Sequence, residues 1–533
     1  MSHGRREPFR SRLPASFPLL RLAGLAGLLG SLLPAVLLAR PGGGEGYSGG
    51  GSGSSGGGSG GGGDGGLVWL VIRLRIELVI HYPAIGIPLT VVVLVYLVRR
   101  AKRRAALAGS SASWDSPAPP PPPAAPPRRT ASDLEAIRAL DPDFSVAVFE
   151  DFAYALFARG HEARAKPADL ETLAPYLGAA ARGHLAGRHP PGAPVSNVVI
   201  GALRVVGVAL PAGSPPTPGE QVEVDLEIEA NLTVGSPEQN RGQSGRERGA
   251  ERTHYVRERW HLVRGAGVRS KPPEKVRTFQ CPNCGAPFGT QGTDRCEYCG
   301  QVTSGGRFDW SVESIVLLSL EERPPAVGSD VQEVGTDWPT VFHPQAGARW
   351  AELRSADPAL TEEGLATRLA LIYGELNAAW SAGDLPRIRP FVSDGLFGYL
   401  RYWVEAYERQ GLRNVLEGMH IVRWQMVKVL RDRYFDAVTL RVWGSGRDYL
   451  VRKSDGGRVS GDPRRERAYS EYWTLLRGAA VRGAPRADRS CPNCGATLEV
   501  NMAGECAHCG SKVTAGDFDW VLSRIEQDDS YQG

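Results

Sequence analysis

The eight cysteines of the chain form two copies of one pattern. In each copy, Cys-Pro-Asn-Cys-Gly is followed, after ten intervening residues, by a second Cys-x-x-Cys-Gly. Each position in the second copy lies 210 residues after its counterpart in the first. The cysteines are Cys281, Cys284, Cys296 and Cys299 in the first copy and Cys491, Cys494, Cys506 and Cys509 in the second. This spacing indicates an internal duplication.

Four thiolates in two close pairs, each pair on a tight turn that contains glycine, suit a tetrahedral ion such as zinc. A closed set of four sulfurs leaves no position for water, so an ion held there stabilises a fold and does not catalyse. We therefore predict two structural zinc ions and assign all eight cysteines as metal ligands. Two disulfides per copy are the alternative that the spacing leaves open in an oxidising compartment.

The first 130 residues predict a targeting and membrane segment. We expect a signal peptide or N-terminal anchor over 1–40, because arginines precede a run rich in leucine and alanine. A Gly/Ser-rich linker follows over 41–66. Residues 67–104 are predicted to hold an interfacial segment, a transmembrane helix and a basic flank, and 105–130 a proline-rich linker.

The predicted transmembrane helix, 78–98, carries no formal charge and is long enough to cross the hydrocarbon of a bilayer. A basic cluster follows it at once: Arg99, Arg100, Lys102, Arg103 and Arg104. Positive flanks remain on the cytoplasmic side. We therefore expect a single-pass protein of the inner (plasma) membrane whose later domains lie in the cytoplasm, where thiols stay reduced.

The charge balance gives little reason to expect a polyanionic partner. The chain has 62 basic and 58 acidic residues, for a formal net charge of +4. The cysteine-rich segments mix both signs: Asp294, Arg295 and Glu297 in the first, and Glu499, Glu505 and Lys512 in the second. Because neither forms a basic stripe, binding of nucleic acid through these segments is the less favoured alternative.

Each copy begins with helical spacing and ends with strand spacing. Asp141-Pro142 and Asp357-Pro358 have the residue types of a helix N-cap and first turn, and amphipathic helical patterns follow both. Alternating apolar residues then predict strands, for example from Val222 to Ile228. Further strands are expected around Trp260 and Trp473 before each cysteine pattern, and over 310–317 and 520–525 after it.

The predicted fold class is α+β: two tandem domains, each with helices first and an antiparallel sheet second, behind one transmembrane helix. Each zinc ribbon is expected between the last two strands of its sheet. The predicted boundaries are 131–322 for the first domain, with its ribbon at 277–305, a linker at 323–356, and 357–528 for the second domain, with its ribbon at 488–515.

The Asp-Pro openings, the aromatic-rich first helix and the Leu-x-x-Leu-x-Pro-Tyr second helix resemble the Tim44-like domain family. The resemblance covers roughly 130–320 and 357–527, and bacterial membrane-anchored proteins with such domains are similar throughout. It implies a fold of the nuclear transport factor 2-like group, in which helices wrap a curved sheet around a concave face. It also implies a membrane-associated, non-catalytic binding domain. Because the chain has two copies and two ribbons, a role in protein import is not implied.

These features predict a membrane-anchored scaffold that binds a protein, peptide or lipid at the cytoplasmic face, with membrane lipid and an unidentified protein or peptide as partners. We expect no enzymatic activity. The alternative is a small-molecule enzyme or ligand-binding pocket of the same fold, for which His184, His254, His261 and Asp225 are the candidates. Because these histidines have no counterparts in the second copy, we interpret them as surface or core groups. Phe308-Asp309-Trp310 and Phe518-Asp519-Trp520 are expected in the core.

Overall fold

The computed structural model describes residues 134–211, 216–217, 219–235, 251–288, 294–322 and 333–533, which all belong to one compact unit. The predicted signal segment, the first linkers and the transmembrane helix at 78–98 lie outside the described residues. Among the helices that are described, none is both long and apolar enough to cross a bilayer.

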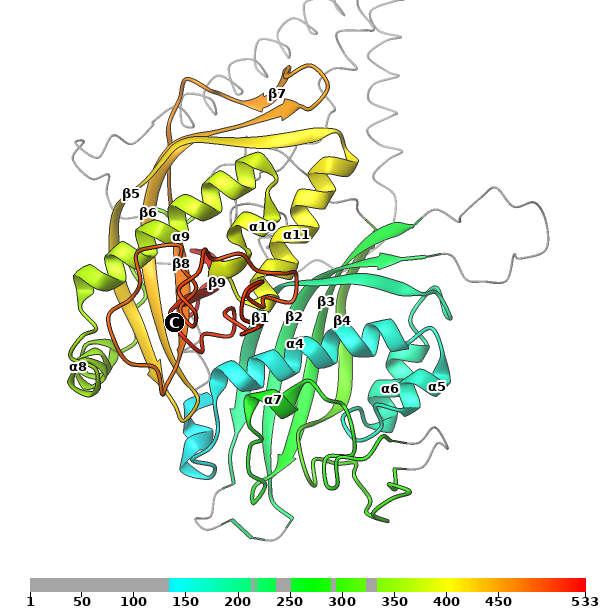
Figure 1. Cartoon of the computed structure of the whole chain (residues 1–533). Coiled ribbons are helices and arrows are strands. Elements are labelled where there is room, and N and C mark those ends of the chain that lie inside the picture. Colours follow the sequence, from blue (N-terminus) through cyan, green and yellow to red (C-terminus); the bar gives the residue numbers. More distant parts are fainter. Residues whose placement is uncertain (1–133, 212–215, 218, 236–250, 289–293, 323–332) are drawn as a thin grey trace, which may run out of the picture. The chain divides into compact units, whose positions relative to one another are not determined.

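The first repeat, 131–322, places its helices before a four-stranded antiparallel sheet of order β1-β2-β3-β4. Figure 1 shows α4 lying across one face of this sheet. The elements are η1 (Leu134–Ala139), α4 (Val146–Ala163), α5 (Pro167–Glu171), α6 (Ala179–Ala186), β1 (Val195–Ala209), β2 (Gln221–Val234), β3 (Arg252–Gly265), α7 (Pro273–Val276) and β4 (Ser311–Glu322).

The second repeat has the same order of layers, and its sheet runs β5-β6-β8-β9 with the short β7 paired to β6. Its longest helix, α9, packs against β5. The elements are α8 (Ala346–Ala356), α9 (Glu362–Ala382), α10 (Leu385–Ile388), η3 (Arg389–Phe391), α11 (Asp394–Arg409), β5 (Leu412–Arg431), β6 (Phe435–Arg452), β7 (Arg458–Gly461), β8 (Arg467–Gly478) and β9 (Val521–Gln527).

Each core forms where the apolar face of the sheet meets the long helix. In β2 the alternating apolar residues from Val222 to Ile228 are fully buried, as their period of two predicts. Phe157 of α4 packs on Trp260 of β3, with ring centroids 5.1 Å apart. Tyr373 of α9 and Trp473 of β8 make the corresponding contact at 5.6 Å. The α+β prediction is therefore confirmed, with helices on an antiparallel sheet in both repeats.

The predicted helix starts were wrong by several residues. The N-cap of α4 is Ser145, whose hydroxyl accepts a hydrogen bond from the backbone N–H of Val148, and the N-cap of α9 is Thr361. Asp141 and Asp357 lie four residues before these caps. The Asp-Pro pairs have the residue types of a cap, but their carboxylates bind partners far away in the sequence.

Those partners are buried arginines at the ends of strands. Arg264, the penultimate residue of β3, lies 3.0 Å from the Asp141 carboxylate, and its guanidinium stacks on the ring of Trp310 at 4.7 Å. In the second repeat, Arg477 lies 2.9 Å from Asp357 and stacks on Trp520 at the same 4.7 Å. The two tryptophans are buried, as predicted for the core.

The cysteine-rich segments lie between β3 and β4 and between β8 and β9, so their predicted insertion between the last two strands is confirmed. One boundary differs from the prediction. Helix α8 occupies the end of the segment predicted as a linker at 323–356, and its Trp350 and Leu353 belong to the core of the second repeat. Apart from alanines, the helix has only Trp350 and Leu353 as apolar residues, so its sequence shows no strong amphipathic pattern.

We predict that Asp141→Asn destabilises the first repeat by about 3–5 kcal/mol, because it leaves the buried Arg264 guanidinium without its carboxylate. Urea unfolding of the full-length chain measures the effect. The matched control is Asp143→Asn, which removes a carboxylate two residues away that pairs with the exposed Arg433. Equal midpoints for the two variants would show that the Asp141–Arg264 pair does not stabilise the fold.

Candidate metal centres

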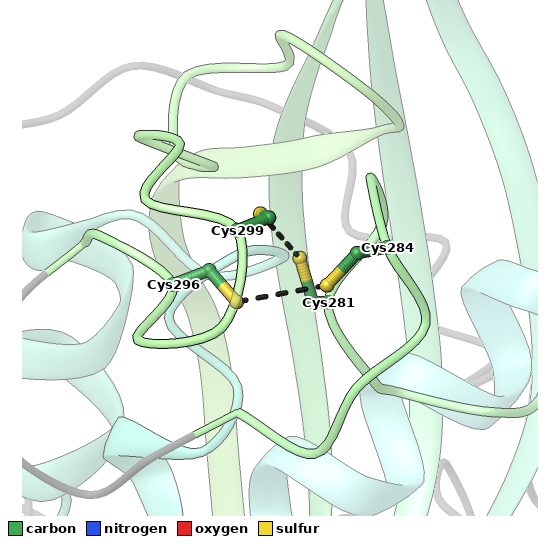
Figure 2. Close-up of side chains that lie close together, drawn as sticks. All are labelled: Cys281, Cys284, Cys296 and Cys299. Atoms are coloured by element: carbon green, nitrogen blue, oxygen red, sulfur yellow. Dashed lines mark hydrogen bonds between the residues drawn. The ribbon is translucent and has the colours of Figure 1, made fainter.

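The four cysteine sulfurs of each copy come together in a cluster. All four ligand atoms of a cluster lie within 4.8 Å of one another. In the first copy the Cys281 and Cys299 sulfurs are 3.9 Å apart and those of Cys284 and Cys296 are 3.8 Å apart, as Figure 2 shows. In the second copy Cys491 and Cys509 are separated by 3.8 Å. Each cluster thus joins the first Cys-x-x-Cys pair to the second.

These distances fit one ion and not a bond between sulfurs. Four sulfurs at the usual Zn–S distance of about 2.3 Å stand about 3.8 Å apart at the corners of a tetrahedron. A disulfide needs about 2.05 Å. All eight cysteines are free. The donor set therefore fits a tetrahedral, sulfur-preferring metal ion.

Backbone hydrogen bonds shape the turn that presents each pair. The N–H of Gly285 donates to the carbonyl of Cys281 at 2.8 Å, and Gly495 donates to Cys491 at 2.9 Å. Gly285 and Gly495 adopt φ of +76° and +75°, in the left-handed region that favours glycine. The Gly after each Cys-x-x-Cys is thus a conformational requirement of the site.

Nearby donors stabilise the ionised form of Cys299 and Cys509, the last cysteine of each copy. The backbone and hydroxyl of Ser511, with the side-chain amide of Asn493, lower the pKa of the Cys509 thiol to about 6. In the first copy the Asn283 amide, with the backbone of Gln301, lowers the pKa of Cys299 to about 6. Because a metal binds the thiolate, these donors favour the ligand form of Cys299 and Cys509. Within the same clusters the pKa is raised for Cys281, to about 12, and for Cys494, to about 11.

Each ribbon is also fixed to its repeat by polar contacts. The hydroxyl of Tyr176 donates to the carbonyl of Gln280, next to the first ligand cysteine, at 2.8 Å. In the second repeat the Lys512 ammonium binds the Asp394 carboxylate at 2.7 Å. The first ribbon is thus attached to the turn between α5 and α6, and the second to the start of α11.

The structure does not bring the four candidate catalytic residues into one site. His261 Nδ1 lies 3.0 Å from the Asp225 carboxylate, on neighbouring strands and in partial contact with solvent. His184, on α6, has its Nε2 2.7 Å from an Arg188 nitrogen. His254 is partly buried at the start of β3.

Sequence reasoning missed a buried network around Glu258. His161 Nε2 lies 3.2 Å from one carboxylate oxygen, and the indole N–H of Trp260 donates to the same oxygen at 2.8 Å. The Arg188 guanidinium donates to the other oxygen. His161 and Glu258 are both 0 % exposed. One feature of the sequence indicated this network: Glu258 is a charged residue at an inward-facing position of a predicted strand, two residues before Trp260.

Comparison with known proteins gives one family match and one similar solved structure. Residues 346–485 match the family model of the Tim44-like domain. A comparison with curated proteins gives no match. A solved structure titled "Ntf2 like protein involved in plasmid conjugation" is similar over 71 % of this chain and 96 % of that chain, at 10 % identity and a TM-score of 0.18. The Tim44-like match spans α8 to the end of β8 and stops before the second four-cysteine cluster.

We predict that the purified full-length chain binds two zinc ions and that Cys284→Ser loses about one of them, because a three-sulfur site holds the ion far more weakly. Elemental analysis by mass spectrometry measures the ratio of metal to protein. Tyr298→Phe, in the same ribbon and at an exposed side chain, is the control and should keep both ions. Unchanged zinc in Cys284→Ser would refute the ligand assignment.

The Glu258 network predicts an acid-dependent contribution to stability. Burial alone would raise the pKa of Glu258, but His161, Arg188 and Trp260 lower it from 4.5 to about 2. A lowered carboxyl pKa stabilises the fold above pH 4.5, and that contribution disappears as the pH falls towards 2.

The difference in unfolding free energy between the wild type and Glu258→Gln should therefore be constant at neutral pH and shrink in this acid range. Denaturant unfolding at a series of pH values measures it. Glu227→Gln, at a half-buried position on β2, is the control. A difference that stays constant down to pH 2 would contradict the assignment of the lowered pKa to Glu258.

Proposed function

We propose that the chain is a membrane-anchored, non-catalytic binding or scaffold protein with two tandem Tim44-like domains, each stabilised by a structural zinc ion. The observation that carries the proposal is the pair of closed four-sulfur clusters. A site whose ligands are all protein sulfurs holds a fold together and leaves no position for a substrate. The Tim44-like match at 346–485 supports a binding role.

The first repeat supports a second domain of the same kind. It shares with the second repeat the buried Asp–Arg pair stacked on tryptophan, the Glu-x-Trp hydrogen bond and the ribbon between the last two strands. In the Glu-x-Trp hydrogen bond, the indole N–H of Trp260 donates to Glu258 at 2.8 Å, and that of Trp473 donates to Glu471 at 2.9 Å. Such shared internal contacts are expected of two copies of one domain.

The surroundings of the buried histidine support a non-catalytic role. A general base must reach its substrate, but His161 and Glu258 are fully buried and bonded to one another. A surface hollow of about 420 Å³ is lined mainly by α4 and the foot of the first ribbon, including Arg159, Glu162 and Phe279. None of the candidate catalytic residues lines this hollow.

The cations of the ribbons support a protein or lipid partner over nucleic acid. Lys512 is held by Asp394, and Arg295 donates to the carbonyl of Gly300 within its own ribbon. A phosphate backbone would have to compete with these contacts. Two tandem domains would instead raise the avidity for a repeated or dimeric protein.

The membrane part of the proposal rests on the sequence of 78–104, where an uncharged stretch precedes a basic flank. We expect the full-length chain to sediment with inner membranes and to need detergent for release. A reporter fused after Gly533 should be active in the cytoplasm. Deletion of 78–98 should release the chain. Activity of a reporter that works only outside the cytoplasm would refute this topology.

Proximity labelling of the full-length chain in membranes identifies what the domains hold. We expect discrete protein neighbours in addition to lipid, and the deletion of 78–98 is the control for labelling that depends only on location. If only lipid is labelled, the chain has a role at the membrane surface and no scaffold function.

A further inference from the structure

Strand β4 forms one edge of the first sheet, and most of its outer side is open. At its start, Val312 has partners on that side: its N–H donates to the Tyr176 carbonyl, and its own carbonyl accepts from the Gly178 N–H, each at 2.8 Å. Over Ser314–Leu320, the backbone has hydrogen-bond partners within the described part of the chain only in β3. Backbone groups left unpaired along an edge can pair with a further strand.

The edge strand β5 of the second sheet is instead capped by other segments of the chain. The Ser381 hydroxyl accepts a hydrogen bond from the Leu416 N–H at 2.8 Å, and the His343 N–H donates to the Val427 carbonyl at 2.8 Å. Native edge strands are often covered, because unpaired backbone groups promote unwanted pairing. Among the described residues, no such cap lies on the outer side of Ser314–Leu320.

The side chains of β4 also differ from those of its counterpart β9. Val312 and Leu522, 210 residues apart, begin the two strands with equivalent parallel bridges to the preceding helical segment. In this register, three apolar residues of β4 stand where β9 has three polar residues. The pairs are Val316 and Glu526, Leu317 and Gln527, and Leu318 and Asp528. Because charged and polar side chains oppose pairing at an edge, β9 is protected and β4 is not.

The apolar residues of β4 lie on both faces of this edge. Val316 pairs with the exposed Arg259 and is itself 53 % exposed. Leu317 lies opposite Glu258, on the face that the helices cover, and both Leu317 and Leu320 are exposed. A strand added at this edge would therefore bury apolar side chains on both faces while its backbone completed the hydrogen bonds of β4.

Two bulges set the length of a partner. The register between β3 and β4 shifts at Glu313 and at Leu318, so the regular edge between them comprises Ser314–Leu317. Bulges bend and twist a strand, which limits how far a straight partner can follow it. A short extended segment therefore fits this edge better than the long strand of another sheet.

The charge of β4 favours a basic partner over a second copy of the chain. The strand has three glutamates and no basic residue. If β4 of a second copy paired antiparallel around Leu317, Glu313 would lie opposite Glu321, and a shift by one residue would place it opposite Glu322. Like charges directly opposite one another destabilise paired strands. Glu322 also contacts Arg252 at 3.0 Å, but this ion pair is exposed and contributes little.

We propose that the outer side of β4 binds a short extended peptide segment with apolar residues in its middle and basic residues at its ends. The segment pairs with Ser314–Leu317 as an additional strand of the first sheet. Backbone hydrogen bonds supply affinity, Val316 and Leu317 select apolar residues, and the glutamates select the basic ends. The inference deepens the proposed binding role and rests on it for the source of the segment, a partner protein.

Fluorescence anisotropy with the full-length chain in detergent tests the site with a fluorescein-labelled probe, acetyl-Lys-Val-Thr-Val-Thr-Val-Lys-amide. The lysine probe should bind. A probe with glutamate in place of lysine should bind at least about tenfold more weakly, because the glutamates of β4 repel it. A lysine probe that is N-methylated at two adjacent central residues should also bind at least about tenfold more weakly, because both of its edges lose an N–H.

The probes also define what would overturn the proposal. Absence of binding by the lysine probe would refute it, and so would tighter binding of the glutamate probe. Equal binding of the N-methylated probe would show that charge alone attracts the peptide and that no strand is added.

Val316→Lys should weaken binding of the lysine probe by at least about tenfold, because a lysine on an edge strand opposes pairing. The matched control is Val422→Lys, which adds the same charge at a valine 45 % exposed on the edge strand β5 and should bind as the wild type does. Both variants should keep the zinc content and the thermal midpoint of the wild type. In hydrogen exchange, the bound probe should slow the amides of β4 and not those of β5.

Equal binding by the wild type and Val316→Lys would refute the site. Analytical ultracentrifugation tests for the other occupant: a dimer that Val316→Lys dissociates would make β4 an interface between copies and the proposal wrong. Each of these failures leaves the zinc content, the membrane location and the proximity-labelled neighbours unchanged, so it is distinguishable from a failure of the proposed function.

Discussion

A buried arginine at the end of a strand organises each repeat. Arg264 and Arg477 bind the aspartate that precedes the first long helix and stack on the tryptophan that follows the ribbon. One guanidinium therefore joins three segments that are far apart in the sequence. Next to it, the chain leaving the first ribbon passes so close that a side chain at Gly306 would meet the Val263 carbonyl at 2.7 Å. The Gly306 carbonyl accepts a hydrogen bond from the Gly265 N–H at 2.8 Å.

A metal ion in each four-cysteine cluster would stabilise the ribbons, which the arginine contact does not reach. Each ribbon is inserted at the end of a sheet and has a very small apolar cluster of its own, which in the first repeat comprises Ala174, Cys281, Phe288 and Cys296 with Cys299 beside them. So few buried groups cannot offset the conformational entropy of an ordered loop. Four sulfur–metal bonds would offset it, because binding of the ion is itself folding energy in a small ribbon. The glycines at φ near +75° then allow each turn to direct two sulfurs at one point.

The sequence was sufficient for features set by short-range spacing. The two Cys-x-x-Cys pairs, the period-two strands and the 210-residue repeat all predicted what the structure contains. The Asp-Pro pairs predicted the wrong helix starts. Aspartate serves both as a helix N-cap and as the partner of a distant buried arginine, and the sequence does not distinguish the two roles. Helix α8 was missed because only Trp350 and Leu353 distinguish it from a linker. The Glu258 network depends on contacts across as many as 97 residues, which no local pattern reveals.

The two repeats share the contacts that join their sheets, helices and ribbons, and they differ at interior positions. Both retain the Asp–Arg–Trp contact, the Glu-x-Trp hydrogen bond and the ribbon, which are the contacts that each sheet needs in order to close on its helix. The differences lie at the C-terminal ends of α4 and α9, where Arg164 stands in one repeat and Trp380 in the other. A tryptophan fills this space and satisfies its single N–H within the core. Arg164 instead brings a positive charge to this position, where the charges of Glu258 and Arg188 act on it. The two copies thus share the contacts that fold them and differ in charge at this interior position.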